Sequence, residues 1–261
     1  GQIVATDAGW RVPGIANLHS HAFQRAMAGL AEHQTHPEDS FWTWREIMYR
    51  FAARMTPEST YAVAAQLYAE MLEAGYTHVC EFHYVHHQPD GTPYADPAAM
   101  SRALIAAARD TGIGMTLLPV PYMTGGFHGR ELSVRQRRFG HDVDGFLRLL
   151  ETLCPQQDES LRVGCAFHSL RAVPETAMRE VLSALPGAAF FHHADSFAMM
   201  RGGHLDYCVL GAYQVSVKGD LANWHTGEPD AIPAVGGAMD LAIGAKNVYV
   251  MMDLLTKKGE S

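Results

Sequence analysis

The chain has 261 residues and a formal net charge of −8, with 48% hydrophobic and 18% charged residues, enough to build one large or two smaller domains. It has no run of lysine and arginine that would favour nucleic acid as a partner, and no apolar stretch as long as a membrane span. The four cysteines lie far apart in the sequence, so we expect a cytoplasmic, reducing environment rather than a disulfide framework.

Apolar runs alternate with helical patterns through about the first 185 residues. β-rich runs predict strands, the first of them buried, and apolar residues at helical spacing predict helices between them. Strands and helices that alternate in this way predict a parallel α/β sheet. The predicted strands cover 11–17, 76–82, 113–120 and 161–167, and the predicted helices cover 57–74, 96–111, 142–153 and 174–185.

Polar side chains gather just after the predicted strands. They are His19 and His21, then Glu81, His83 and Tyr84, and later His168 and Arg171. Side chains grouped at the carboxyl ends of strands are typical of the active face of a (β/α) barrel. An open, doubly wound sheet also binds ligands at strand ends, and the pattern alone does not decide between the two.

The sequence Asn17-Leu18-His19-Ser20-His21 contains the strongest local signal for a metal site. In an extended segment, residues i and i+2 project to the same side, so His19 and His21 could direct two imidazoles at one cation. Imidazole is a common ligand of zinc. The alternative is a pair of solvated loop histidines. Two ligands also leave the site incomplete, because catalytic zinc usually takes three protein ligands and a water.

Other candidates are less specific. Tyr84, at a strand end, is a candidate for contact with substrate, whereas His86 and His87 could belong either to a metal-binding loop or to a half-exposed one. Arg45 and Arg171 each offer a planar guanidinium that matches a carboxylate. From the sequence alone, both arginines fit an ordinary surface ion pair at least as well.

Four segments together carry a resemblance to a known family: 13–25, 40–45, 81–87 and 167–173. Over about residues 1–185 the chain resembles the formimidoylglutamate deiminases of the amidohydrolase superfamily, which implies a TIM-type (β/α) barrel. The resemblance implies that His19 and His21 bind zinc. It also implies that the substrate is contacted by Gln24, Arg45, Tyr84, His168 and Arg171, with the arginines recognising glutamate carboxylates. The implied reaction is hydrolysis of N-formimino-L-glutamate to N-formyl-L-glutamate and ammonia, a step of histidine degradation.

The later part of that family's pattern is missing. His192 and Asp195 keep the spacing of the family's third zinc-binding histidine and its catalytic glutamate, with aspartate in place of glutamate. They are therefore the candidate catalytic residues. Nothing after them resembles strands six to eight of the family, so we expect an incomplete barrel.

The segment from about 186 to 261 instead resembles the second subunit of 3-oxoadipate CoA-transferase. The stretches that carry this resemblance are 185–197, 200–206, 219–224 and 236–241, and we expect an α/β segment with strands over 205–211 and 247–252. That family's nucleophile is a glutamate in a Ser-Glu-Asn-Gly type of motif, which is absent from this sequence. If the tail is transferase-like, the barrel-like spacing of His192 and Asp195 is a coincidence.

Three hypotheses therefore remain for the function. The chain is a metal-dependent deiminase completed by its tail, a CoA-transferase subunit without its nucleophile, or a catalytically silent fusion. An incomplete barrel exposes strand edges and apolar faces, which favours weak or absent activity. The expected partner is a small-molecule substrate, neither nucleic acid nor a membrane, and a homo-oligomer stays open.

Overall fold

A computed structural model of the chain describes residues 4–7, 9–11, 13–30, 41–185, 198, 200–212, 214–223, 236–250 and 252. The chain divides into two compact units, Gly1–Pro186 and Gly187–Ser261, called the first and the second unit below. The candidate catalytic residues His192 and Asp195 lie outside the described residues, so their role stays a prediction.

The first unit is built on a parallel sheet of four strands in the order β3-β4-β5-β6. The strands are β3 (Ile15–Ser20), β4 (Tyr76–His83), β5 (Gly114–Pro119) and β6 (Leu161–Val163). Their spatial order equals their order along the chain, so these four strands lack the reversal point of a doubly wound sheet. The predicted parallel α/β sheet is confirmed. The barrel is not, because the described strands form an open sheet and do not close a ring.

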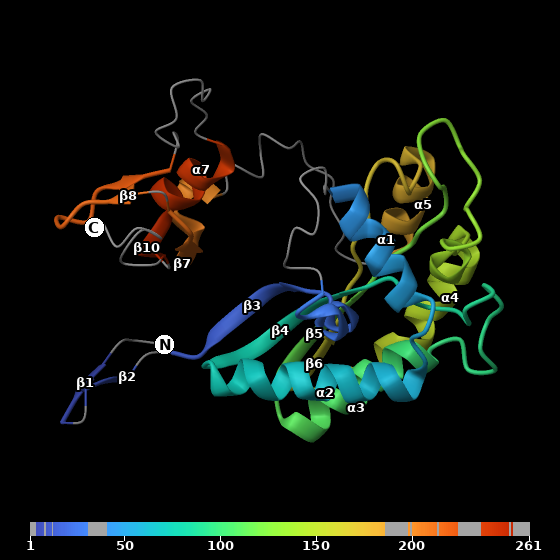
Figure 1. Ribbon diagram of the computed structural model, residues 1–261, viewed down its shortest axis with the longest axis horizontal. Coiled ribbons are helices and arrows are strands. Elements are labelled where there is room, and N and C mark those ends of the chain that lie inside the picture. The colour runs from blue at the N-terminus through green and yellow to red at the C-terminus, as the bar shows by residue number, and fades with distance from the viewer. Residues whose placement is uncertain are drawn as a thin grey trace. The chain divides into compact units, whose positions relative to one another are not determined.

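Helices α2 (Pro57–Glu73) and α3 (Ala99–Thr111) lie side by side along one face of this sheet (Figure 1). Thr56 begins α2 with a capping box, and Gly112, in the left-handed region with φ 81°, ends α3. The remaining helices are α1 (Phe41–Ala52), α4 (Val143–Leu153) and α5 (Glu175–Ala184). The helix predictions for α2 to α5 are confirmed, whereas α1 was not predicted.

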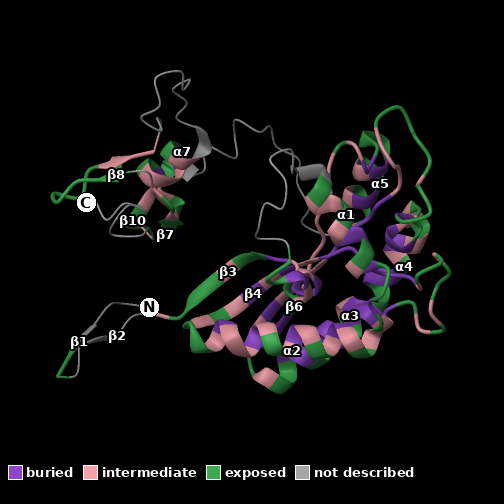
Figure 2. Ribbon diagram, in the orientation of Figure 1, coloured by how far each residue is buried: buried purple, intermediate pink, exposed green. Residues whose placement is uncertain are grey.

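The main core of the first unit lies between the sheet and α2 and α3, where Figure 2 shows the buried residues concentrated. Along β4, alternate residues are buried, because successive strand side chains point to opposite faces. Val79 therefore packs in the core with Tyr68 of α2 and Leu104 of α3. Phe82 lies on the other face of β4 and is only partly buried. This second face carries the candidate site.

Strand β3 differs from its prediction. The strand begins at Ile15, whereas Gly9–Arg11 pairs with Val4–Thr6 in a separate antiparallel hairpin, β1 and β2. The prediction of a buried strand was wrong because β3 is an edge strand, with Leu18 72% exposed. Its register against β4 also shifts between Asn17 and Ser20. A bulge of this kind re-aims the side chains that follow it.

The second unit contains a parallel pair of strands, β7 (Leu205–Leu210) and β10 (Ala245–Val250), with helix α7 (Gly236–Gly244) between them in sequence. Arg201, in the turn η4 (Met200–His204), forms an ion pair with Asp240 of α7. A short hairpin joins β8 (Gln214–Val215) to β9 (Leu221–Ala222). Both strands predicted in this segment are confirmed, β10 about two residues earlier than expected. In the described part of the chain, no helix combines the length and the apolarity needed to cross a membrane.

Candidate metal and substrate site

His19 and His21 meet at the carboxyl end of β3, and their Nε2 atoms are 2.9 Å apart. His21 also places its Nδ1 3.0 Å from the carbonyl oxygen of Phe82. Since a carbonyl only accepts, the proton of His21 lies on Nδ1 and its Nε2 carries a lone pair. Tetrahedral zinc would hold two imidazole nitrogens about 3.3 Å apart, given Zn–N distances of about 2.0–2.1 Å. The two rings therefore need only a small adjustment to share one ion.

The pair fits a divalent ion, but it supplies only part of a site. Among the described residues, no three histidine, cysteine, aspartate or glutamate side chains converge on one point. Any further ligand must therefore come from the undescribed residues, from substrate or from another chain. His19 is exposed and His21 partly buried, so zinc binding by this pair stays a prediction beside the alternative of solvated histidines.

Tyr84 and His168 form a cluster of rings beside His21, called the aromatic wall below. The ring of Tyr84 lies 5.6 Å from that of His21 and 5.4 Å from that of His168, measured between centroids. Gln24 donates its Nε2–H to the Tyr84 hydroxyl at 3.3 Å, so the hydroxyl proton of Tyr84 is available to a ligand. Burial raises the pKa of Tyr84 further above its ordinary value, so this hydroxyl stays protonated. Three of the predicted substrate residues thus lie together beside the histidine pair.

The two predicted arginines lie near His168, but their hydrogen bonds go to other residues. The guanidinium of Arg45, on α1, donates to the Tyr49 hydroxyl at 2.6 and 3.1 Å, and the backbone carbonyl of Arg171 accepts a bond from Thr124 at 2.8 Å. Burial, followed by the positive charge of Arg171, the nearby His21 and Arg45, lowers the pKa of His168 to about 4. His168 is therefore a neutral imidazole at neutral pH, close enough to Arg45 and Arg171 to be affected by their positive charges.

Two buried residues near the site were given no role from the sequence. The ring of Tyr122 lies 4.7 Å from that of His168, and Gln136 donates to its hydroxyl at 3.0 Å. Tyr122 follows β5 as Tyr84 follows β4, so the strand-end rule could have found it. Glu81 accepts the backbone N–H of Ala22 at 2.6 Å, and only its place within the second cluster of polar residues marked it in sequence.

His86 and His87 do not join the metal site. Their Nε2 atoms donate to the backbone carbonyls of Val120 and Gly140, at 3.0 and 2.6 Å. Both rings lie 4.7 Å from that of His141. Both histidines are buried, so the interpretation as a half-exposed loop was wrong. Their role is to tie the loop after β4 to the loop before α4.

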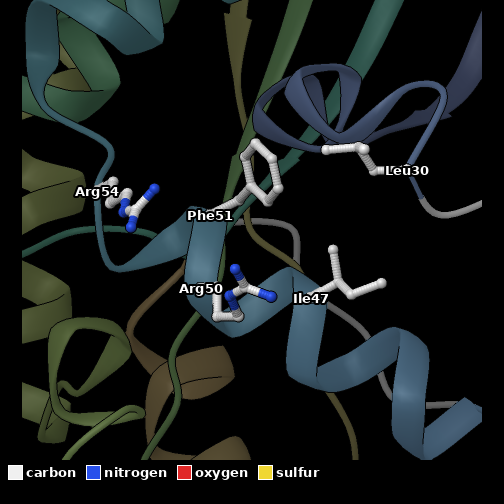
Figure 3. A pocket seen from close by; sticks show the side chains of 5 residues that line it. All are labelled: Leu30, Ile47, Arg50, Phe51 and Arg54. Atoms are coloured by element: carbon white, nitrogen blue, oxygen red, sulfur yellow. The ribbon is translucent and has the colours of Figure 1, made fainter.

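A separate surface hollow of about 380 Å³ lies beside α1 (Figure 3). It is lined by Leu30, Ile47, Arg50, Phe51 and Arg54. None of the predicted site residues lines this hollow, so it is distinct from the histidine pair and the aromatic wall.

Comparison with known proteins accounts for most of the first unit. The chain is 55% identical over 174 residues to formimidoylglutamate deiminase from Pseudomonas aeruginosa, which covers 66% of this chain and 38% of the relative. A solved amidohydrolase from Brucella melitensis matches with a TM-score of 0.63 and 53% identity, covering 67% of this chain and 40% of that one.

The remainder matches a different protein. The family model described as Coenzyme A transferase matches residues 163–261. The second subunit of 3-oxoadipate CoA-transferase from Pseudomonas putida is 73% identical over 85 residues, which covers 33% of this chain and 40% of the relative. The chain is a two-part chimera. Its N-terminal part is a homologue of formimidoylglutamate deiminase, and its C-terminal part is a homologue of the second CoA-transferase subunit.

Each part of the chimera corresponds to less than half of its relative, 38% of the deiminase and 40% of the transferase subunit. The family match begins at residue 163, inside β6, although β6 pairs with β5 of the deiminase-like part. The expected boundary at residues 185 and 186 therefore stays a prediction. A zinc complex of atrazine chlorohydrolase from Arthrobacter aurescens, 21% identical with a TM-score of 0.53, shares the fold over 66% of this chain and 38% of its own.

Proposed function

We propose that the deiminase-like part carries two zinc ligands and the substrate-binding residues of a zinc-dependent site for N-formimino-L-glutamate. This chain by itself hydrolyses that substrate to N-formyl-L-glutamate and ammonia at a negligible rate. The observation that supports the site is the approach of the His19 and His21 Nε2 atoms to 2.9 Å, with Nδ1 of His21 held by a backbone carbonyl. The low rate is supported by the described residues, among which no three histidine, cysteine, aspartate or glutamate side chains converge on one point.

The residues divide the work of binding. His19 and His21 would hold the ion, which when bound would supply a water of lowered pKa as the nucleophile. Arg45 and Arg171 would bind the glutamate carboxylates, because planar guanidinium groups match carboxylates. Gln24, Tyr84 and His168 would orient the formimino group, with the Tyr84 hydroxyl as hydrogen-bond donor. His192 and Asp195 stay the candidates for catalysis.

The metal proposal predicts weak zinc retention. A full chain purified without added metal should hold well below one zinc per chain, because two imidazoles alone bind a structural or catalytic ion incompletely. Metal analysis of the chain and of His19→Ala provides the measurement. His128→Ala is the control, because His128 is an exposed histidine outside the pair. Zinc at one ion per chain that is lost in His19→Ala would contradict the prediction of weak retention.

The activity proposal is tested separately with N-formimino-L-glutamate in the presence of added zinc. Ammonia release should stay at the level of the His19→Ala variant, because the described residues complete no catalytic centre. Release clearly above that variant would show a working deiminase and overturn the proposed low rate.

A second candidate function comes from the 73% identity of the C-terminal part to the transferase subunit. Such enzymes would form a covalent thioester between the protein and CoA, which requires a nucleophilic carboxylate. Because the family's Ser-Glu-Asn-Gly type of motif is absent from the sequence, we expect no adduct. Mass spectrometry of the chain after incubation with an acyl-CoA checks this, and a stable CoA adduct would favour the transferase.

The setting that we propose is cytoplasmic. All four cysteines are free thiols in the structure, which fits a reducing compartment. Self-association stays open as part of the proposal, and light scattering of the purified chain would decide it.

A further inference from the structure

Glu81 is a buried carboxyl group that the proposed function does not use. It lies near the end of β4, is 2% exposed and points toward α2. There it accepts the hydroxyl of Tyr68 at 3.2 Å and the backbone N–H of Ala22 at 2.6 Å. Burial of a carboxyl group costs free energy unless hydrogen bonds satisfy it. A residue that served packing alone would not need these two donors.

The bond to Ala22 places Glu81 directly behind the histidine pair. Ala22 follows His21 and begins the turn η1 (Ala22–Met27), in which the side chain of His21 forms no capping bond. The next residue of β4, Phe82, accepts Nδ1–H of His21 at 3.0 Å. Two successive residues of β4 thus hold His21, one through the neighbouring backbone and the other through its ring.

This double hold follows a point where β3 is irregular. The register shift between Asn17 and Ser20 interrupts the ladder, which resumes with a single last pair, Ser20 and Glu81. His21 lies one residue beyond this pair, so the strand pairing alone does not fix the direction of its ring. The 2.6 Å bond from Ala22 to Glu81 adds a second fixed point on the other side of His21, so Glu81 adjoins the backbone both before and after this ring. Partners behind a metal-binding histidine fix its tautomer and orientation in this way.

We propose that Glu81 is the positioning residue for His21, holding the Ser20–Ala22 backbone so that Nδ1 faces Phe82 and Nε2 faces His19. The inference rests on the proposed function in one respect, namely that the two imidazoles hold a divalent ion. The orientation of the ring itself does not depend on the ion and can be measured without it.

The experiment compares two variants of the full chain. Glu81→Gln keeps the length of the side chain and an oxygen that can accept the N–H of Ala22. Glu81→Asp is one methylene shorter, which moves the carboxylate away from that N–H. Glu73→Gln, at an exposed glutamate at the end of α2, is the control. For each protein, NMR of the metal-free chain reports the tautomer of His21, competition titration gives the zinc dissociation constant, and urea titration gives the unfolding free energy.

We expect Glu81→Gln and the control to keep the Nδ1–H tautomer of His21 and the wild-type zinc constant. Glu81→Asp should mix the tautomers and weaken zinc about 10-fold or more. If Glu81→Asp loses stability but keeps both the tautomer and the zinc constant, Glu81 is only structural and the inference is wrong. If the wild-type chain binds no zinc, the proposed metal site fails, while the tautomer still decides the role of Glu81.

Discussion

Between about pH 6.5 and pH 4.5 we expect the first unit to lose stability steeply. Besides His168, it contains a group of four histidines whose pKa burial lowers when the chain is folded: His83, His86, His87 and His141. Burial lowers the pKa of each, and neighbouring histidines and Arg138 lower several of them further. The ring centroids of His83 and His86 are 5.0 Å apart. A proton on either ring would therefore make protonation of the other ring less favourable.

The sign follows from where protons bind. In the unfolded chain these histidines titrate near pH 6.5, and in the folded chain they titrate lower, His141 at about 3. Below pH 6.5 the unfolded state therefore binds more protons, and the free energy of unfolding falls as pH falls. A histidine that stays neutral in the folded chain and is protonated in the unfolded one contributes at most about 1.4 kcal/mol per pH unit. Glu81 offsets one of them, because burial raises its pKa to about 7 and it binds a proton when folded.

The measurement is urea unfolding of the full chain at several pH values, followed by hydrogen exchange of α2 and α3. His141→Phe keeps a ring against His86 and His87 but cannot ionise. It should therefore lower the slope of the unfolding free energy against pH by the equivalent of about one proton. Its cost at neutral pH should be small, because Nε2 of His141 is buried without a partner. His128→Asn, at an exposed loop position, should leave the slope unchanged. Equal slopes for all three proteins would contradict the expectation.

The elements that were predicted well from the sequence are those with clear start and stop signals at their ends. Helix α2 starts at a capping threonine and a proline and stops before Gly75, and α3 stops at Gly112, so periodicity and end signals agree. Helix α1 was missed because its aromatic first turn has weak helix propensity. Strand β6 was predicted too long, and ends at Val163.

The site was predictable in its parts but not in its connections. The strand-end rule pointed to His19, His21, Tyr84 and His168, and the structure brings all four together. The bond between Ala22 and Glu81 spans 59 residues, and no local pattern encodes such a pair. The same holds for His86 and His87, whose burial depends on distant loops. Since His192 and Asp195 lie outside the described residues, their contribution stays a prediction.

Replacement of Arg138 should cause the largest loss of stability of any single substitution considered for this chain. Arg138 is 1% exposed and donates to three backbone carbonyls. These belong to Met55 at 2.9 Å, His87 at 3.0 Å and Ala52. Its own carbonyl accepts the backbone N–H groups of His86 and His87 at 3.1 and 2.9 Å. Arg138 therefore joins the end of α1, the turn before α2 and the loop after β4.

Arg138→Met keeps the length of the aliphatic stem but removes every donor. The buried carbonyls of Met55 and His87 then lose the Arg138 bonds, whereas that of Ala52 keeps the backbone N–H of Met55. We expect a loss of about 2–5 kcal/mol in the free energy of unfolding, because each buried carbonyl left unsatisfied costs about 1–3 kcal/mol. Arg135→Met is the matched control, because Arg135 has a side chain that is 55% exposed and pairs with Glu46 on the surface, and its loss should cost at most about 1 kcal/mol. Urea titration gives both values, and hydrogen exchange should show that the added opening starts at the end of α1 and in the loop that carries Tyr84. Of these two arginines, Arg138 bonds to buried carbonyls and Arg135 pairs on the surface. An equal loss of unfolding free energy in the two variants would therefore mean that the bonds of Arg138 do not stabilise the fold.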